Sequence, residues 1–402
     1  MDNQFDFTTE AFPRGTCSVK WDSCGTDVIP MWVAEMDFPV APCIAKALHE
    51  RIDKRFFGYT LIPDSYYESV RSWFSQRHGW DFPREQIIPV QGIVPATSIA
   101  IKALTVPGDK VVLCTPAYNC FFHNITNQGC GIAESPLVWN AEKRSYEMNF
   151  PEIEALCSDP AVKAFLLCNP HNPTGRAWSR NELRRLGEIC LRHGVTVICD
   201  EIHCEITAPG IRYTPFASLS PEFAQNSISF VSPTKGFTIP GLQIANIVSA
   251  NPDFRSRMDR VINIWEHCDV NQLGIVALQA AYTPEGADWL KQMNEVVHAN
   301  FVELRDTFAS RYPSVRMPAE LEATYLVWAD LQECRFSVQP QGASGDFVAG
   351  QLLGKHKVRI NGGSIYGGPT GIRINVACPR TTFKEGLRRI CEGLDELLEG
   401  NL

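Results

Sequence analysis

The chain has 402 residues, of which 45% are hydrophobic and 20% charged, and its formal net charge is −8 at pH 7. These proportions are those of an ordinary globular enzyme, and the negative charge argues against nucleic acid or an anionic membrane as a partner. No apolar run approaches the ~18 residues that a transmembrane helix needs, and the acidic, polar start of the chain does not predict a signal peptide. We therefore expect a cytoplasmic protein.

The fifteen cysteines are a high number for such a chain. No two of them have the two-residue spacing of zinc or redox motifs. Buried, reduced thiols in a cytoplasmic protein are the simpler interpretation, so we expect no metal site.

The N-terminal part of the chain predicts an arm followed by helices. The first 45 residues contain several prolines and two tryptophans with little helical periodicity, which predicts an extended arm. Apolar residues at four-residue spacing then predict a helix over residues 42–55, and a second helix is expected over 64–78. Gly92 opens a third helix that continues to about Leu104. Free backbone N–H groups at such a helix start are a candidate anion site, although most turns of this kind bind nothing.

Short apolar segments in the middle of the chain predict buried strands, near residues 111–114, 164–168, 195–200, 227–231 and 244–248. They alternate with helical segments, which predicts an α/β fold with a mostly parallel sheet and helices on both faces. A smaller α+β domain is expected to follow, with strands at 325–328 and 371–377 and a closing helix begun by a Thr382–Glu385 capping box. The predicted division is an arm at 1–45 that packs with the small domain, a large domain at 46–282 and the small domain at 283–402.

Three segments place polar residues at the carboxyl ends of predicted strands. Lys235 lies in a tight turn between two strands, Asn172 in a loop with two Asn-Pro pairs, and Asp200 at the end of an apolar strand, where an unpaired carboxylate is costly. A lone lysine in a turn is most often a solvated loop residue. In an open α/β sheet, however, the carboxyl ends of the strands line the ligand crevice, so we expect the three side chains to converge on one pocket.

The motifs Asn-Pro-x-Asn-Pro-Thr-Gly (169–175), Asp-Glu (200–201), Ser-x-x-Lys (232–235) and Gly-Ile-Arg-Ile (371–374) occur in this order. The chain thereby resembles the fold-type I pyridoxal 5′-phosphate enzymes, the aspartate aminotransferase superfamily, over nearly its whole length. Segments 30–38, 57–59, 200–203 and 215–219 are more similar to the cystathionine β-lyase (C–S lyase) branch of the MalY/PatB kind. The resemblance implies a three-layer sandwich and pyridoxal 5′-phosphate as the cofactor.

The resemblance also implies roles for individual residues. Lys235 would bind the cofactor covalently and act as the base at the substrate's Cα, and Asp200 would keep the ring nitrogen protonated. Tyr118 would stack beside the ring and could transfer a proton, although by itself it is more typical of a half-buried core aromatic. Further cofactor contacts are expected from Gly92, Ile93, Val94, Asn172, His203, Ser232 and Tyr59. The tyrosine at position 59 would reach the phosphate of a neighbouring subunit, which implies a homodimer with composite active sites.

Two of the candidate residues keep two interpretations. Arg373 alternates with isoleucines along a predicted strand. It either lies on a wet face of that strand or binds the α-carboxylate of the substrate with its planar guanidinium, beside Asn172. The family motif favours the second interpretation. His203 is either a structural histidine or part of the pocket wall near the ring.

One departure from the superfamily pattern bears on the reaction. Many aminotransferases carry an arginine eight residues after the lysine, where this chain has Gln243, and the C–S lyase branch also lacks it. No second arginine for a dicarboxylate stands out near Arg373, and a thiolate, whose thiol has a pKa of about 8.5, leaves with little acid help. We therefore predict a β-lyase that converts an L-cysteine thioether (cystathionine or a cysteine conjugate) to thiol, pyruvate and ammonia. The alternative is an aminotransferase. A cofactor-binding regulator is not favoured, because Lys235 and Asp200 are both intact.

Overall fold

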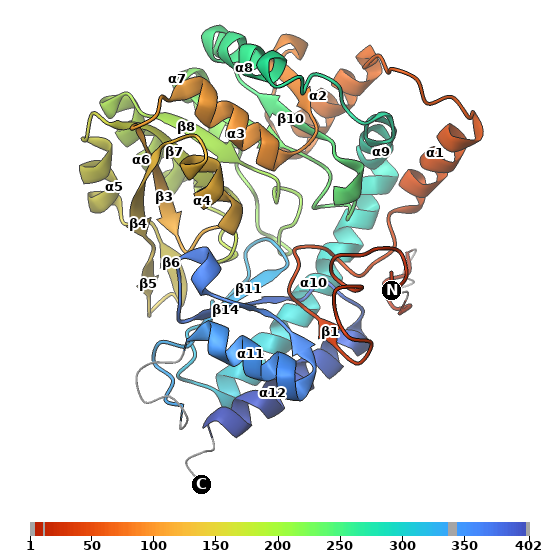
Figure 1. The fold of residues 1–402 in the computed structure, drawn as a ribbon, viewed down its shortest axis with the longest axis vertical. Coiled ribbons are helices and arrows are strands. Elements are labelled where there is room, and N and C mark those ends of the chain that lie inside the picture. Colours follow the sequence, from red (N-terminus) through yellow and green to blue (C-terminus); the bar gives the residue numbers. More distant parts are fainter. Residues whose placement is uncertain (1–4, 11–12, 337–343, 399–402) are drawn as a thin grey trace.

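The computed structural model describes residues 5–10, 13–336 and 344–398, and a large upper and a smaller lower part are visible in Figure 1. The helices are α1 (Pro42–Asp53), α2 (Asp64–His78), α3 (Ile93–Leu104), α4 (Asn119–Thr126), α5 (Phe150–Cys157), α6 (Arg180–His193), α7 (Pro221–Gln225), α8 (Pro252–Ile264), α9 (Gln272–Ala281), α10 (Pro284–Arg311), α11 (Gly345–His356) and α12 (Arg380–Leu398). None of these helices is long and apolar enough to cross a membrane.

The large part is built on a seven-stranded sheet with the order β2-β10-β9-β8-β7-β3-β4. Its strands are β2 (Ile87–Val90), β3 (Lys110–Thr115), β4 (Gly131–Pro136), β7 (Val162–Cys168), β8 (Thr196–Asp200), β9 (Ser227–Val231) and β10 (Ala245–Val248). Only β10 runs antiparallel to its neighbours; the pairings among β9, β8, β7, β3 and β4 are all parallel. The prediction of a mostly parallel sheet is confirmed.

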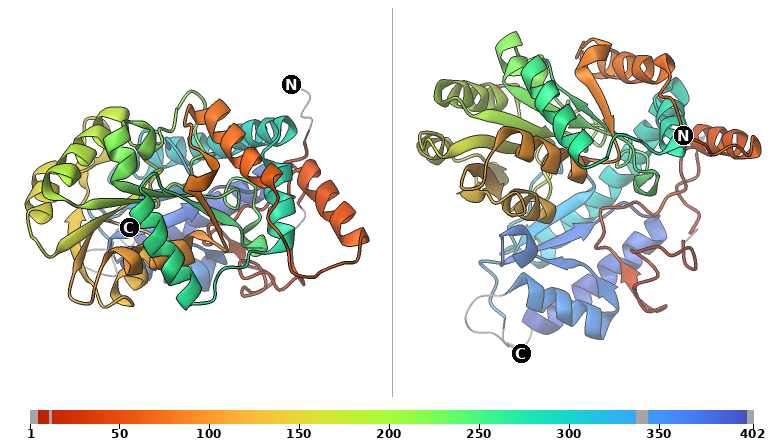
Figure 2. Two further views of the ribbon diagram at one scale, coloured as in Figure 1. Left: turned by 90° about the horizontal axis from the view of Figure 1, so that it is seen from above. Right: turned by 45° about the horizontal axis from the view of Figure 1, so that its top comes forward.

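Helices cover both faces of this sheet because its strands are apolar on both sides. Alternate residues of β7 contribute to two separate clusters: Phe165 and Leu167 pack with α5 and α6, and Ala164 and Leu166 pack with α3, α4 and α8. Near-continuous apolar runs are typical of strands buried in this way. The result is the expected three-layer sandwich, which the two further views in Figure 2 also show.

The smaller part contains a three-stranded sheet, β11-β14-β13, flanked by α11 and α12. Its strands are β11 (Leu326–Asp330), β13 (Asn361–Gly362) and β14 (Gly371–Asn375). Two short strands, β1 (Ile29–Pro30) and β12 (Val358–Arg359), join the N-terminal arm to this part in parallel. A hairpin of β5 (Val138–Asn140) and β6 (Ser145–Glu147) lies apart from these sheets. The exact domain boundaries stay a prediction.

Most predicted elements agree with the structure, and one local detail does not. Ser179 caps α6 in a complete capping box with Glu182. The predicted Thr382–Glu385 capping box is wrong, because α12 begins earlier, at Arg380. There Thr382 Oγ1 donates to Glu10 Oε1, and Glu385 pairs instead with arginines of its own helix.

Candidate active site

Lys235 lies in the turn after β9, and the turn is anchored by buried neighbours. Phe237 packs fully buried against the Trp289 ring, with ring centroids 5.9 Å apart. The Lys235 amine points the other way and donates to the backbone oxygen of Ala34 over 2.6 Å. Removal of water around the amine and the nearby Arg373 cation lower the pKa of Lys235 to about 8. The amine is therefore easier to deprotonate near neutral pH than an ordinary lysine.

Asp200 ends β8 at the floor of the same pocket, with only 4% of its surface exposed. Among the described residues its carboxylate accepts one hydrogen bond, from the backbone N–H of Ile202 at 3.1 Å. Burial raises the pKa of Asp200 to about 6, and Lys235 opposes that shift. A buried carboxylate with so few donors is costly unless a partner arrives, and a protonated ring nitrogen is such a partner.

Asn172 is presented by a buried loop at the end of β7. Gly175 closes this loop with a φ of +74°, and an added Cβ there would lie 2.3 Å from Leu321 Cδ1, so both conformation and space require glycine. Asn172 accepts a hydrogen bond at Oδ1 from Arg373 Nη1. None of the described residues accepts a hydrogen bond from its side-chain amide N–H₂, so this donor is free at the pocket surface.

Arg373 is 4% exposed on β14, and its guanidinium has no carboxylate partner among the described residues. Nη1 donates to Asn172 Oδ1 over 3.2 Å and Nη2 to Trp32 O over 2.8 Å, while the buried Nε has no partner. The group stacks 4.6 Å from the ring centroid of Tyr366. Burial lowers the pKa of Arg373. Of the two interpretations of Arg373, the structure excludes a wet strand face. A buried arginine without an anion is typical of a site that receives one.

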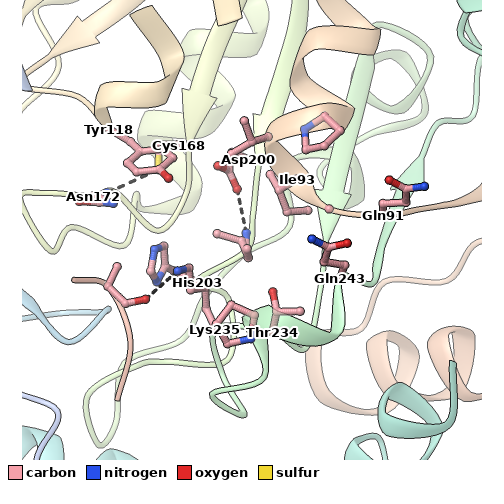
Figure 3. A pocket seen from close by; sticks show the side chains of 16 residues that line it. Gln91, Ile93, Tyr118, Cys168, Asn172, Asp200, His203, Thr234, Lys235 and Gln243 are labelled. Carbon is pink, nitrogen blue, oxygen red and sulfur yellow. Dashed lines mark hydrogen bonds between the residues drawn. The ribbon is translucent and has the colours of Figure 1, made fainter. Parts of the chain in front are cut away.

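Lys235, Asp200 and Asn172 line a cavity of about 350 Å³, and Arg373 lies beside it, bonded to Asn172. Figure 3 places Tyr118 and Asn172 on one side of it and Gln91, Ile93 and Gln243 on the other. The second side includes the first turn of α3, which starts at Ile93 after Gly92. The N–H groups of a first helical turn have no acceptor within the helix, so this side can receive an anion such as a phosphate.

Two aromatic side chains complete the pocket wall. Tyr118 is half-buried directly before α4, and burial raises the pKa of its hydroxyl above the usual value. His203 is buried with no partner for Nδ1. Burial, Lys235 and Arg373 lower the pKa of His203 to about 3, so the ring is neutral. Of the two interpretations of His203, the structure therefore favours a pocket residue with a free ring nitrogen.

Three of the predicted site residues, Arg373, Ser232 and Tyr59, are not among the residues that line this cavity. Arg373 is connected to it through its hydrogen bond to Asn172. Ser232 is buried behind the pocket wall, where its hydroxyl donates to Ile244 O and accepts from the Thr234 N–H; Thr234 lines the cavity in its place. Ser232 thus supports the turn, and its contact with the phosphate stays a prediction. Tyr59 is fully exposed on the loop between α1 and α2 and does not enter the pocket of its own chain.

Several lining residues were not predicted from the sequence: Ala34, Gln91, Pro95, Cys168, Ile202, Thr234, Pro240 and Gln243. A signal existed for three of them. Ala34 and Ile202 lie in the segments 30–38 and 200–203 that carried the likeness to the C–S lyase branch, and Gln243 marked the departure from the aminotransferase pattern. The others are neutral residues beside the motifs, and the residue type alone does not separate them from ordinary loop residues.

The fold and the arrangement of these residues are typical of a known class of proteins. Comparison with known sequences identifies the family. Residues 26–390 match the family model "Aminotransferase class I and II", and the chain belongs to that family. Cystathionine β-lyase PatB of Bacillus subtilis (strain 168) is 39% identical over 383 residues, which are 94% of this chain and 96% of PatB.

Two solved structures show the same fold at similar identity. A PLP-bound C–S lyase from Staphylococcus hominis has a TM-score of 0.89 and 32% identity, with 98% of this chain and 99% of that chain covered. A PLP-bound candidate aminotransferase from Clostridium difficile 630 has a TM-score of 0.91 and 35% identity, with coverages of 97% and 100%. The shared fold and cofactor are common to both, while the reactions in their names differ.

Proposed function

We propose that this protein is a pyridoxal 5′-phosphate-dependent carbon–sulfur β-lyase. It would convert an L-cysteine thioether and water into a thiol, pyruvate and ammonia. The observation that carries the proposal is the pocket itself. A lysine of lowered pKa and a buried carboxylate with one donor among the described residues line one cavity, and a buried arginine without an anion lies beside it, bonded to the lining residue Asn172.

The residues of the pocket fit this cofactor. Asp200, with one donor among the described residues, would hold the ring nitrogen, and the free amide of Asn172 would donate to the phenolic oxygen. The start of α3 would hold the phosphate, with His203 in the pocket wall. Gln243 occupies the position of the superfamily's arginine, so the phosphate would depend on backbone N–H groups, Thr234 and helix α3 for its stabilisation.

Each charged group then has one task in the reaction. When bound, pyridoxal phosphate supplies the electron sink for the charge that develops at Cα of the amino acid. The neutral amine of Lys235 removes the Cα proton, and such positioned proton transfer contributes roughly 10²–10⁴ in rate. Arg373 holds the α-carboxylate with its planar guanidinium. Asp200 keeps the ring nitrogen protonated throughout.

The pocket favours elimination over transamination. Its charged lining side chains are Lys235 and Asp200, with Arg373 beside them, so no second cation faces the substrate side chain within the described residues. A dicarboxylate would find no partner there, whereas a neutral thioether needs none. The identity to PatB supports the same choice. The likeness to the candidate aminotransferase keeps transamination as the second candidate.

We further propose a cytoplasmic homodimer with composite active sites. Phe56, Phe57, Tyr59 and Leu61 are between 62% and 102% exposed on one loop, which is unusual for large apolar side chains on a monomer. All fifteen cysteines are free thiols, as expected in a reducing compartment.

Two measurements test the proposed function. The purified protein should absorb visible light, and borohydride treatment should fix the cofactor to Lys235 in a peptide map; a label on another lysine would refute the site. A panel of cystathionine, cystine and S-substituted cysteines, scored for thiol, pyruvate and ammonia, then identifies the substrate. Failure of every sulfur amino acid on the panel would refute the lyase assignment.

A further inference from the structure

A second buried carboxylate, Glu205, lies five residues after Asp200 and outside the pocket. Only 2% of Glu205 is exposed. Its Oε1 accepts from Trp73 Nε1 and is 2.7 Å from His78 Nε2, while Oε2 accepts from Arg77 Nε over 2.9 Å. These three partners lie on the last two turns of α2, so one carboxylate holds that helix against the loop after β8.

The donor set distinguishes this cluster from a metal site. His78, Cys204 and Glu205 have ligand atoms within 4.8 Å of one another. The Arg77 guanidinium, however, is in direct contact with the same carboxylate and would repel a cation. Burial by itself would raise the pKa of Glu205, but His78, Arg77 and Trp73 together lower it to about 2. The group is therefore an anion whose hydrogen-bonding capacity is already used.

The Glu205 side chain also packs against the turn that carries the lysine. An added Cβ at Gly236, the residue after Lys235, would lie 3.2 Å from Glu205 Cβ and 3.4 Å from Leu290 Cδ2. The backbone of the turn is thus in close contact with Glu205. Trp73 adds a second connection, since its ring lies 6.2 Å from that of Phe237 and stacks on Tyr282 at 4.7 Å.

The backbone of Glu205 is fixed as well. Its carbonyl accepts from Asn294 Nδ2 of α10 over 2.9 Å. The two polypeptide segments that supply Asp200 and Lys235 therefore meet at one buried anion, which is held from α2 on one side and from α10 on the other. None of these contacts touches the cavity.

We propose that Glu205 is a positioning residue that sets the separation between Asp200 and Lys235. This inference rests on the proposed function only in that its measurements use the cofactor and the lyase reaction. Displacement of a catalytic group by about 1 Å can lower a rate roughly 100-fold. Loss of the carboxylate should therefore reduce the chemical step and the affinity for pyridoxal phosphate, while substrate binding through Arg373, which lies on β14, is spared.

The test variant is Glu205→Gln, which keeps the volume but places an N–H₂ group against one of the three donors. We expect kcat to fall roughly 10- to 100-fold and the Kd for pyridoxal phosphate, measured by visible absorbance, to rise about tenfold. KM for the thioether should change by less than about twofold. Trp73→Phe keeps most of the aromatic packing and removes only one donor, and is expected to cause the same changes to a smaller degree should Glu205→Gln fail to fold.

Tyr312→Phe is the matched control. Its buried hydroxyl donates to Asp395 Oδ1 and Cys391 O, so the variant loses stability in the small part without altering the loop after β8. If Glu205→Gln lowers the unfolding midpoint like the control but leaves kcat and the cofactor Kd at wild-type values, Glu205 is merely structural and the proposal is overturned. A wild-type protein that binds no pyridoxal phosphate would instead refute the proposed function, which keeps the two failures distinct.

Discussion

Asp200 and Glu205 are two carboxylates on one loop with nearly equal burial and opposite electrostatics. Asp200 has one hydrogen-bond donor, and burial raises its pKa to about 6. Glu205 has three side-chain partners, which lower its pKa to about 2 despite burial. The described residues therefore leave most of the hydrogen-bonding capacity of Asp200 unused, whereas that of Glu205 is used. In this pair, the missing hydrogen-bond partners, more than burial or charge, distinguish the carboxylate that lines the cavity.

The buried arginines repeat the contrast. Arg176 is 8% exposed and forms ion pairs with Glu182 and Glu322, and those carboxylates raise its pKa against the effect of burial. Arg373 is 4% exposed with only neutral acceptors, and burial lowers its pKa. Asp200 lines the cavity and Arg373 lies beside it, bonded to Asn172, whereas Glu205 and Arg176 hold the scaffold.

The largest effect is expected from removal of Lys235, which lines the cavity together with Asp200. Lys235→Ala should lower turnover by more than about 10⁴-fold, because both the covalent attachment and the base at Cα are lost. The variant should still bind pyridoxal phosphate reversibly through Asp200, Asn172 and the start of α3, as measured by equilibrium dialysis. Retention of more than a few per cent of wild-type turnover would contradict the assignment.

Asp200→Asn should lower activity and raise stability, and this combination tests the comparison between the two carboxylates. Activity should fall at least about 100-fold, since a neutral amide does not hold the ring nitrogen protonated. At pH 8 the free energy of unfolding of the cofactor-free variant should exceed that of the cofactor-free wild type by about 1–3 kcal/mol, so the variant should unfold at a higher denaturant concentration. The sign follows from the raised pKa: the folded state binds more protons between pH 3.8 and about 6, so wild-type stability falls as pH rises through that window.

Glu205 predicts the opposite pH dependence. Its folded-state pKa of about 2 lies below the ordinary glutamate pKa of 4.5, so its contribution to stability is complete above pH 4.5 and is lost as pH falls toward 2. Denaturant unfolding of cofactor-free Asp200→Asn and Glu205→Gln proteins at pH 3 and at pH 8, on either side of the Asp200 window and within and above the Glu205 window, measures both signs. Equal shifts in the two variants would remove the distinction between the two carboxylates.

Arg373→Ala should act mainly on substrate binding. The loss of a charged hydrogen bond corresponds to about 1.5–3 kcal/mol, or a rise in KM of roughly 10- to 150-fold, with a smaller change in kcat. Arg176→Ala is the matched variant, because Arg176 is the buried arginine that has two carboxylate partners. It should lower stability and leave KM unchanged. A similar KM in Arg373→Ala and the wild type would exclude Arg373 from carboxylate binding.

The smallest effect is expected from Tyr59, on the exposed loop between α1 and α2. If Tyr59 completes a neighbouring site, a mixture of inactive Tyr59→Ala and Lys235→Ala proteins should regain up to about a quarter of wild-type activity, because half of the dimers are hybrids with one intact site. Each variant incubated alone is the control. A fully active monomer in sedimentation would exclude composite sites.

The sequence predicted the parts of the site that follow from sheet topology. Asn172, Asp200 and Lys235 could be placed together because parallel strands deliver their carboxyl ends to one edge. The carbonyl of Ala34 reaches Lys235 from 201 positions away, and no local pattern signals it. Ser232 was assigned to the phosphate from a motif, but the carbonyl of Ile244 holds its hydroxyl. The Glu205 cluster spans 132 positions and depends on how α2 packs, which periodicity does not reveal.

The stoichiometry of the reaction tests the central claim most directly. Purified protein with pyridoxal phosphate and a single L-cysteine thioether, without any keto acid, should release thiol, pyruvate and ammonia in equal amounts over many turnovers. Addition of a keto acid should leave that rate unchanged. A reaction that stops without a keto acid, and with it yields a new amino acid but no thiol or pyruvate, would make the protein an aminotransferase and contradict the account.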